Sequence, residues 1–371
     1  MSTLIFIAPI NWEDKNSGVS LKVKNEYLVF NKYFDSYISA FEGNDVVIYH
    51  GEECVYRDDS NEKHRVLKQF GIDKFIIENS IDYVYIRYAL AFPQQIAMLK
   101  RIRNHVKKIV VEFPDYPYIR EWVKAKKPVQ VVMDILLRSS YGRYIDRAFA
   151  CTNKKSINGI DTSQLINGTN IEDYSIKQFD EHDYIGIISV SSMSTAHGID
   201  RFIRGMNDYY NNGGVRDIRF SVIGNGVEYE NLSNLVKSLK LSDRVTLYGF
   251  IPNGEQDSFY ANNDIGLGAI GFHRISIKDD STLKSREYGL RGMPIIAENK
   301  IDIVDDTFPY VMYCPKDESP VDINKVVAFY DACFMDKSKK EVGEAIRYYF
   351  IERCDINRTM IPVVRYFESN E

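Results

Sequence analysis

Residues 264–298, "DIGLGAIGFHRISIKDDSTLKSREYGLRGMPIIAE", have the pattern of one strand–helix–strand unit. The opening "DIGLGAI" and the closing "MPIIAE" are short apolar runs typical of buried strands. Between them, a helix is expected to begin near Ser281 or Thr282 as N-cap and to stop at Gly292, before Pro294. A helix that joins two buried strands indicates a right-handed crossover between parallel strands.

The same alternation continues on both sides of this unit. The first half contains the apolar runs "LIFIAPI", "DVVIYH", "FIIE", "YVYIRY", "KKIVVEF" and "RAFACT", and the second contains "YIGIISV", "IRFSVIG", "RVTLYGF" and "YVMYC". Segments with helical spacing separate many of them, including "VSLKVKNEYLVFNKYF", "GIDRFIRGMNDYY" and "EYENLSNLVKSLK". Two such series predict an α/β protein with two doubly wound, Rossmann-like domains.

The acidic, aperiodic stretch "NIEDYSIKQFDEHD", residues 170–183, is expected to be the linker. We therefore predict an N-terminal domain over residues 1–172 and a C-terminal domain over 173–352, with a helix over about 353–371 packing back on the first domain. Ligands of doubly wound sheets bind beyond the carboxyl ends of the strands. The functional site is therefore expected in a cleft between the domains.

Composition excludes several classes of protein. A chain of 371 residues that is 44% hydrophobic fits about two globular domains. Its net charge of -5 and pI of about 5.8 disfavour nucleic-acid binding. Five scattered cysteines without a CxxC pair indicate reduced thiols and a cytosolic protein, and no ligand-spaced histidine pair suggests a metal site. The sequence shows neither a signal peptide nor a membrane-spanning run.

Residues 97–147 carry a local excess of positive charge, with twelve lysines and arginines against five acidic residues. Such a basic region would suit an anionic membrane or a lipid-diphosphate acceptor. The alternative is a solvated basic face without a partner.

The expected helix start near Ser281 carries chemistry for a phosphorylated ligand. Its N–H groups and the positive end of its dipole attract anions, and Lys284 in the first turn adds a full charge. Glu287 offers two acceptor oxygens, which suit the neighbouring hydroxyls of a ribose. Alternatively, Lys284, Glu287 and Arg291 form an ion-pair ladder on a solvent-facing helix.

The run from "GIDRFIRGM" through "FSVIGNGVEYENLSNLVKSLKLSDRVTLYGFIPNGEQDSFYANNDIGLGAI" to "LKSREYGLRGMPII", within residues 184–300, resembles the C-terminal domain of bacterial glycosyltransferases of family 4. "NGTNIEDY" just before the linker supports the resemblance. It implies the GT-B fold, in which two Rossmann-like domains face each other across a cleft. It also implies a retaining transferase that uses a nucleotide-sugar donor, a UDP-sugar being favoured here, and requires no metal or other cofactor.

The resemblance also assigns donor-side residues. The family's two acids, separated by seven residues, match Asp279 and Glu287. Glu287 would hold the donor ribose, and Asp279 would lie beside the donor sugar, where the family usually has glutamate. The diphosphate would be held at the helix start by a set of four residues: Ser281, Thr282, Leu283 and Lys284.

One departure concerns the diphosphate. The arginine and lysine that hold it in the family correspond here to Ser192 and His197. The chain is similar to a subgroup with "WHGxDR", "YIRY" and "E-x-PTYPY" at the matching places. His197 would then donate to phosphate, or else cap its turn, whereas Arg201 is expected at the surface or between the domains.

Other donor-side candidates are weaker. Gly224 in "GNG" is either a phosphate turn or an ordinary tight turn. Phe250 and Ile251 in "GFIPN" would flank the base by resemblance, although both could be core residues and Ile251 fits the core better. Gly18 begins a helix after a long loop, where it would allow a phosphate or sugar to approach, or the loop is a routine one.

The acceptor is expected on the first domain. "VVEFPDYPY" leaves a strand through two prolines and is expected to expose Glu112, Asp115, Tyr116 and Tyr118 for contact with a sugar. The resemblance points to Glu112, Tyr116 and Tyr118. Arg87 at the end of "YVYIR" would face an anionic substrate or form a structural ion pair.

These observations favour a cytoplasmic glycosyltransferase, peripheral at the inner face of the cell membrane. Its acceptor would be a glycan, lipid-linked or protein-linked, in the synthesis of a bacterial surface polysaccharide or glycoconjugate. Catalysis is assigned to Lys284, Asp279 and His197. Two alternatives remain open: a non-catalytic GT-B partner that binds an acceptor and assists another transferase, and a nucleotide-sugar epimerase.

Overall fold

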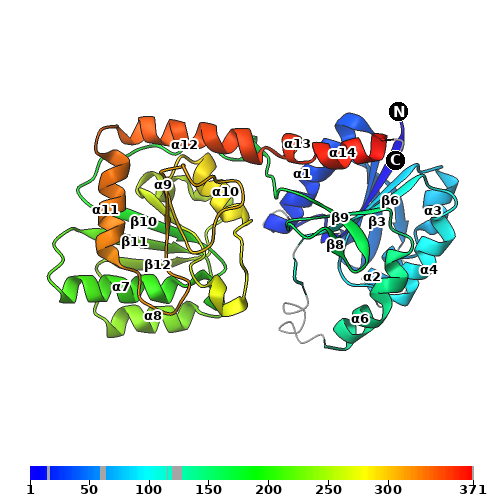
Figure 1. Ribbon diagram of the computed structural model, residues 1–371. Coiled ribbons are helices and arrows are strands. Elements are labelled where there is room, and N and C mark those ends of the chain that lie inside the picture. The colour runs from blue at the N-terminus through cyan, green and yellow to red at the C-terminus, as the bar shows by residue number, and fades with distance from the viewer. Residues whose placement is uncertain (15–16, 59–63, 115, 119–127, 370–371) are drawn as a thin grey trace. The chain divides into compact units, whose positions relative to one another are not determined.

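The chain forms two compact units (Figure 1) in a computed structural model that describes residues 1–14, 17–58, 64–114, 116–118 and 128–369. Unit 1 comprises Met1–Asn167 and Ile356–Glu371, and unit 2 comprises Gly168–Asp355. The unit boundaries lie within a few residues of those expected at 172 and 353. Thr169 belongs to unit 2 because its backbone N–H donates to the carbonyl of Cys354 at 2.8 Å.

Unit 1 contains a mixed sheet in the order β4–β3–β2–β1–β5–β6–β7–β9–β8. The central strands are parallel, and the pairs β2–β3, β3–β4 and β8–β9 are antiparallel. Their bounds are β1 Thr3–Asn11, β2 Asp35–Glu42, β3 Asp45–His50, β4 Glu53–Asp58, β5 Tyr83–Arg87, β6 Lys108–Phe113, β7 Arg147–Ala150, β8 Ser156–Ile157 and β9 Ile160–Gln164.

Helices cover both faces of this sheet because alternate residues of each strand point to opposite sides. On β1, Leu4 and Phe6 pack with α1, whereas Ile5 and Ile7 pack with α2, α3, α4 and α6. The helix bounds are α1 Gly18–Tyr33, α2 Arg65–Gln69, α3 Asp73–Glu78, α4 Pro93–Ile102 and α6 Pro128–Gly142.

One expected strand is wrong, since "FIIE" lies in α3. Phe75 and Ile76 are buried in the core beside β3 and β5. A four-residue apolar run has no periodicity that separates a buried strand from a buried helical turn. Asp73 in the first turn fits a helix start.

Unit 2 contains an all-parallel sheet in the order β12–β11–β10–β13–β14–β15. Its strands are nearly continuous apolar runs, as expected when helices cover both faces. The bounds are β10 Ile185–Val190, β11 Ile218–Ile223, β12 Val245–Gly249, β13 Ile265–Leu267, β14 Ile295–Ala297 and β15 Val311–Tyr313.

Helices α7, α8 and α11 cover one face of the second sheet, and α9, α10 and α12 cover the other (Figure 1). Every helix that follows a strand begins at the carboxyl edge of the sheet, so the strand-to-helix turns gather there. The helix bounds are α7 Ile199–Asn211, α8 Tyr229–Ser238, α9 Asp257–Ala261, α10 Leu283–Leu290, α11 Ile323–Phe334 and α12 Lys339–Cys354.

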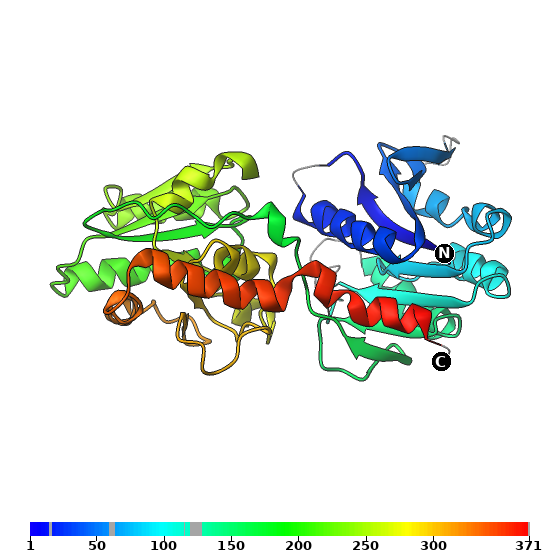
Figure 2. The ribbon, with the colours of Figure 1, turned by 90° about the horizontal axis from the view of Figure 1, so that it is seen from above.

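The C-terminal segment belongs to unit 1, where the sequence places it. Helices α13 (Ile356–Thr359) and α14 (Ile361–Glu368) lie beside α1, as the red segment of Figure 2 shows. Phe367 is fully buried and makes edge contacts with Phe30 of α1 and with Phe34 directly after that helix. A hydrophobic C-terminal turn therefore anchors the returning chain.

None of the helices within the described residues combines the length and apolarity needed to cross a bilayer.

Candidate functional site

The start of α10 lies where the sequence predicts it. Thr282 is the N-cap, and its side chain accepts from the backbone N–H of Ser285 at 3.4 Å. The helix ends at Leu290, and Gly292 follows with a φ of +78°. The free N–H groups of the first turn therefore sit on the carboxyl-edge side of unit 2.

Glu287 is the centre of a buried hydrogen-bond network on α10. Its Oε1 accepts from the hydroxyl of Tyr260 at 2.7 Å and from Nε of Arg291 at 3.4 Å. Its Oε2 accepts from Nζ of Lys284 at 2.7 Å. Arg291 also lies over the Tyr260 ring, 4.0 Å from its centroid, and pairs with Asp257 at 2.7 Å. The two carboxylate oxygens of Glu287 thus have different surroundings.

Electrostatics keep Glu287 ionised. Burial is the largest influence and opposes ionisation, but Lys284, Tyr260 and Arg291 outweigh it and lower the pKa of Glu287. Oε1 is held by two buried groups, whereas Lys284, at Oε2, keeps 34% of its side chain exposed. Of the two carboxylate oxygens, Oε2 is therefore the one whose partner has access to solvent.

The expected ion-pair ladder exists, but it does not face solvent. Glu287 is only 6% exposed and Arg291 only 5%. A charged ladder with such burial is unlike the weak surface pairs of an exposed helix. The solvent-facing ladder expected as the alternative therefore does not describe Glu287 and Arg291.

Of the two neighbouring aspartates, Asp279 is exposed and Asp280 is buried. Oδ1 of Asp280 accepts from the backbone N–H of Thr282 at 2.9 Å and from its hydroxyl at 2.7 Å. Oδ2 is buried without a hydrogen-bond partner, and burial raises the pKa of Asp280. The side chain of Ser281 binds Asp302 at 2.8 Å. The sequence spacing selects Asp279, but Asp280 is the aspartate that caps the turn before α10.

His197 lies in η2 (Thr195–His197), which follows β10 at the carboxyl edge. Its Nδ1 accepts from the backbone N–H of Ser194 at 3.1 Å, which assigns the proton of the neutral ring to Nε2. Burial lowers the pKa of His197, and the charge of Lys284 acts in the same direction. The ring is therefore a neutral Nε2–H donor whose Nδ1 caps the turn.

The glycine turns at this edge are filled by the chain itself. A Cβ on Gly224, which has a φ of +125°, would meet the carbonyl oxygen of Ser191 at 1.8 Å. A Cβ on Gly226 would meet the carbonyl oxygen of Ser192 at 1.9 Å. The close approach that "GNG" permits is thus to the loop after β10. This packing favours the ordinary-turn interpretation of Gly224.

Phe250 and Ile251 differ in exposure. Phe250 directly follows β12 and is 64% exposed. Ile251 packs against the buried cluster that contains Tyr260, and its carbonyl accepts from Gln256 at 2.7 Å. Phe250 is therefore available for contact with a ligand, whereas Ile251 behaves as a core residue.

Arg201 is buried within unit 2, which corrects the expectation of a surface or interdomain charge. Its side chain is 1% exposed. It donates to the carbonyls of Ser319 and Pro315, both at 2.9 Å, and also to the carbonyl of Ile270. Glu298 lies 3.4 Å from Nη1. Arg201 thus ties together the loops that follow β13, β14 and β15.

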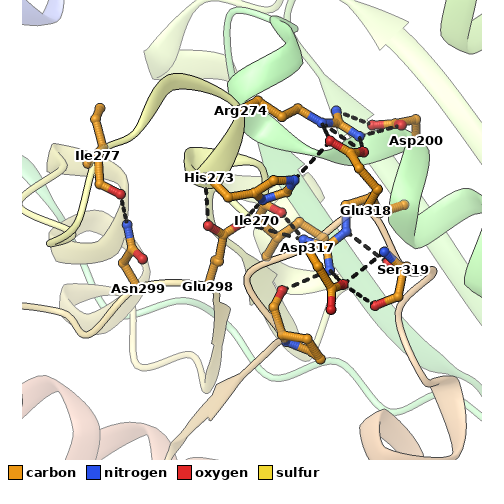
Figure 3. Close-up of polar contacts among 12 residues, drawn as sticks. Asp200, Ile270, His273, Arg274, Ile277, Glu298, Asn299, Asp317, Glu318 and Ser319 are labelled. Carbon is orange, nitrogen blue, oxygen red and sulfur yellow. Dashed lines mark hydrogen bonds and ion pairs between the residues drawn. The ribbon is translucent and has the colours of Figure 1, made fainter.

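A second ionic cluster, drawn in Figure 3, shares Glu298 with Arg201. His273 lies between two carboxylates, with Nδ1 2.8 Å from Glu298 and Nε2 2.9 Å from Glu318. Arg274 pairs with Asp200 at 2.8 Å and with Glu318 at 2.5 Å. Burial lowers the pKa of His273, but Glu298 and Glu318 outweigh it and raise that pKa above its usual value. These pairs brace the carboxyl edge of unit 2.

A pocket of about 450 Å³ opens between α7 and α8. It borders the turn that carries His197, but neither Lys284 nor Glu287 lines it. Its polar lining includes Ser194, Thr195, Asp200, Arg204, Asn231 and Asn234. The pocket is therefore distinct from the Glu287 network.

In unit 1, Glu112 and Arg87 belong to a buried ionic cluster. Nη1 of Arg87 lies 3.0 Å from Oε1 of Glu112, and Nζ of Lys22 lies 3.3 Å from both Glu112 and Glu26. Glu112 is 0% exposed and Arg87 9%. The expected exposure of Glu112 is therefore wrong. Of the two alternatives for Arg87, the structural ion pair fits the structure better than a site open to an anionic substrate.

Glu26 gives this cluster a specific pH dependence. Burial, reinforced by Glu112, raises its pKa to about 7, while Lys22 and Arg87 oppose the rise. A carboxyl whose pKa is higher in the folded protein than in the unfolded protein favours folding while it is protonated. This contribution is complete below the unfolded pKa and is lost as pH rises towards 7. Between pH 5 and pH 8, we expect ionisation of Glu26 to lower the free energy of unfolding of wild type by about 2–3 kcal/mol. The Glu26→Gln variant should lack this fall.

The measurement is the free energy of unfolding by urea at pH 5, 6, 7 and 8 for wild type and Glu26→Gln. Glu78→Gln, an exposed glutamate of the same unit paired with Lys74, is the matched control and should follow wild type. A parallel pH dependence of Glu26→Gln and wild type would contradict the raised pKa.

Tyr118 is also buried rather than exposed. Its hydroxyl donates to Asp134 at 2.9 Å and accepts from Asn158 at 2.9 Å, and its side chain is 6% exposed. Tyr116 is partly exposed, and Nζ of Lys154 lies 5.9 Å from its ring centroid. Asp115 lies outside the described residues. Tyr116 thus keeps the accessibility that a sugar contact requires.

Gly18 begins α1 as expected and is exposed. Ser17 is the N-cap and accepts from the backbone N–H of Ser20 at 3.2 Å. Residues 15 and 16 of the preceding loop lie outside the described residues. Over the part of the chain that is described, no group of three His, Cys, Asp or Glu side chains is arranged so that it could hold a metal ion.

The structure brings together Lys284, Glu287 and His197 at the carboxyl edge of unit 2. Sequence reasoning missed Tyr260, whose "SFYANND" context carries no recognisable motif. It also missed Asp280, although that residue directly precedes the expected capping residues. The acceptor-side residues are split, because Glu112, Arg87 and Tyr118 are buried in two networks while Tyr116 is accessible.

Comparison with known proteins supports a transferase fold. Residues 170–267 match the family model described as "Glycosyl transferases group 1". No curated protein sequence gives a significant match.

Solved structures resemble the whole chain. Sucrose-phosphate synthase from Thermosynechococcus elongatus is 13% identical with a TM-score of 0.69, and all of both chains is covered. A glycosyltransferase from Rickettsia africae is 12% identical with a TM-score of 0.65, over 100% of this chain and 99% of that one. Anabaena Alr3699/HepE, solved with UDP-glucose, is 11% identical with a TM-score of 0.63, over 99% and 100%. At such low identity the likeness shows the fold alone, and that fold is GT-B.

Proposed function

We propose that the protein is a retaining glycosyltransferase that moves a sugar from a UDP-sugar to an acceptor hydroxyl. The observation that carries the proposal is the Glu287 network at the start of α10, with one carboxylate oxygen held by buried groups and the other paired with a half-exposed lysine. The family match over residues 170–267 and the GT-B fold support it. The complex of Anabaena Alr3699/HepE with UDP-glucose favours UDP as the nucleotide.

In this proposal, Glu287 binds the donor ribose through Oε2. Lys284 exchanges its partner from Glu287 to the diphosphate, while Tyr260 and Arg291 keep Oε1 in place. The first-turn N–H groups of α10 at Leu283 and Lys284 meet the diphosphate, whereas the N–H of Thr282 stays bonded to Asp280. The hydroxyls of such a ligand therefore meet the acceptor Glu287, and its phosphates meet the donors at the helix start, only one helical turn away.

Charge builds up on the leaving diphosphate as the glycosidic bond breaks. Lys284 and the α10 dipole stabilise that charge, and the neutral His197 donates from Nε2. The acceptor hydroxyl passes its proton to the leaving phosphate on the same face of the sugar, which retains the anomeric configuration. The chemistry needs positioning and electrostatics, and we propose no metal or other cofactor.

The acceptor belongs to unit 1 in this proposal, with Tyr116 as the accessible aromatic contact. We propose a glycan, lipid-linked or protein-linked acceptor in the synthesis of a bacterial surface polysaccharide or glycoconjugate. None of the five cysteines, all within the described residues, forms a disulfide, which fits a reducing cytoplasm. A peripheral membrane contact would bring the enzyme to a lipid-linked acceptor.

Tyr260 provides a test of how Glu287 is positioned. Tyr260→Phe removes only the hydroxyl that holds Oε1, so we expect about tenfold weaker UDP binding with little change in folding. Tyr288→Phe is the matched control, because that buried hydroxyl binds the N–H of Val190 at 3.0 Å instead of Glu287. Calorimetric titration of UDP measures both variants. Equal losses in the two variants would show that Tyr260 acts only through packing.

The proposed reaction is tested by incubating the purified chain with radiolabelled UDP-sugars and a panel of glycan, lipid and peptide acceptors. We expect transfer from one UDP-sugar, with an axial or equatorial product bond matching that of the donor. Epimerised donor without any acceptor would support the epimerase alternative. UDP binding without transfer or hydrolysis across the panel would support the non-catalytic partner.

A further inference from the structure

Helix α6 of unit 1 exposes an aliphatic stripe that the proposed reaction does not use. Leu136 is 74% exposed, Val129 69%, Val132 57% and Ile135 43%. Residues 129, 132 and 136 follow one another at helical spacings of three and four, so they lie on one face. Four large exposed aliphatic side chains within two turns form a continuous apolar surface rather than scattered contacts.

The orientation of α6 is fixed from its inner side. Asp134 is fully buried and accepts from the backbone N–H of Ala91 at 2.8 Å, from the hydroxyl of Tyr118 at 2.9 Å and from the hydroxyl of Tyr88. Tyr141, one face away from the stripe, is also fully buried. Rotation of the helix would break these hydrogen bonds to a buried carboxylate. The aliphatic stripe therefore stays outside.

The charges exposed on α6 and directly after it, among the described residues, are basic. Asp134 is the only acidic residue of α6 and it is buried, whereas Arg138 lies on the helix and exposed Arg143 follows its end. Residues 119–127, which precede the helix in the sequence and lie outside the described residues, carry Arg120, Lys124, Lys126 and Lys127 against Glu121. An exposed apolar face on a helix with an excess of basic residues is typical of a helix that lies in an anionic lipid surface.

Other cations of the 97–147 region contribute less to such an attraction because they have local partners. Arg101 pairs with Asp73 at 2.5 Å, Arg103 with Asp146 at 2.8 Å and Lys107 with Asp82 at 2.9 Å. Nζ of Lys108 donates to the carbonyls of Tyr366 and Ser369. The basic surface is thus narrower than the sequence predicts.

We propose that α6 docks on an anionic lipid bilayer, with Val129, Val132, Ile135 and Leu136 inserted into the interface and Arg138 and Arg143 at the headgroups. A second copy of the chain fits this face less well, since a symmetric contact would bring the same basic residues of both copies together. The docking gives the membrane contact of the proposed function a location. It does not depend on nucleotide binding or sugar transfer.

The test is co-sedimentation of the full chain, without nucleotide, with vesicles of pure phosphatidylcholine or of phosphatidylcholine with about 30% of the anionic lipid phosphatidylglycerol. Wild type should bind the anionic vesicles, and 0.5 M salt, roughly a Debye length of 4 Å, should weaken binding. We expect Val132→Glu/Leu136→Glu to weaken it at least about tenfold. The matched control is Val19→Glu/Leu28→Glu, two exposed residues of α1 in the same unit, and it should bind like wild type.

A single tryptophan reporter separates insertion from simple adhesion. Leu136→Trp fluorescence should shift to shorter wavelength on anionic vesicles and stay unchanged on neutral ones. Equal binding by the α6 and α1 double variants, or the absence of wild-type binding to anionic vesicles, would overturn the proposal. A wild-type dimer that Val132→Glu/Leu136→Glu dissociates, together with no vesicle binding, would assign the stripe to self-association instead. Donor binding and transfer in solution are measured separately, so either proposal can fail alone.

Discussion

Replacement of Lys284 by alanine should lower kcat for sugar transfer by about 10²–10³-fold, equivalent to about 3–4 kcal/mol of transition-state stabilisation. In the free protein, Nζ of Lys284 is bound to Oε2 of Glu287, and 34% of the side chain is exposed. Its charge becomes most valuable when the diphosphate departs, because charge on that group increases along the reaction. The loss should therefore fall mainly on kcat, with a smaller change in the KM for the donor.

Folding stability should hardly respond to Lys284→Ala. Glu287 keeps Tyr260 and Arg291 as partners, and because Lys284 is one-third exposed, water can take its place at Oε2, so we expect a loss of about 1 kcal/mol. Lys300→Ala is the matched control, since Lys300 is an exposed lysine of the same unit paired with Asp306. Steady-state kinetics measure sugar transfer by both variants, and thermal midpoints of unfolding measure their stability. Transfer by Lys284→Ala at the wild-type rate would remove Lys284 from the mechanism.

The largest stability effect is expected at Arg201. Arg201→Met keeps most of the side-chain volume but leaves the carbonyls of Ile270, Pro315 and Ser319 without their donor. It also leaves the buried Glu298 with a single cationic partner, His273. Breaking a buried charge network in this way costs about 3–5 kcal/mol.

Urea unfolding measures this loss, with Arg216→Met as the matched control. Arg216 pairs with Asp331 at 3.1 Å, but both side chains are more than 40% exposed, so its loss should cost less than about 1 kcal/mol. If Arg201→Met does not fold, Arg201→Lys should fold with intermediate stability. Equal stability of Arg201→Met and Arg216→Met would contradict the bracing role of Arg201.

Much of the fold can be predicted from local patterns. The unit 2 strands are apolar runs because both of their faces are covered, and helix α10 has its cap and stop residues within the same short stretch. The antiparallel edge strand β4 gives a weaker signal, because it is mostly exposed and its sequence "ECVYRD" is polar. The helical state of "FIIE" depends on packing against β3 and β5, which a short run does not encode.

The candidate site is less predictable because burial decides it. Lys284, Glu287 and His197 could be selected by type and position, since charge at a helix start and imidazole at a turn are local features. Tyr260 lies far from Glu287 in the sequence, and only the packing of α9 against α10 brings its hydroxyl to 2.7 Å. Glu112 looks accessible at the end of a strand, but Lys22 and Arg87 enclose it.

If the charges of α10 hold a nucleotide diphosphate sugar, Glu287 must contribute to nucleotide affinity. Calorimetric titration of UDP, GDP, ADP and their sugars into wild type and Glu287→Gln, which removes the carboxylate but keeps its shape, measures that contribution. We expect one nucleotide, UDP, to bind wild type selectively and to bind Glu287→Gln at least about tenfold more weakly. Equal affinity in both proteins, or no nucleotide binding by wild type, would contradict it and leave the Lys284–Glu287–Arg291 network as a structural one.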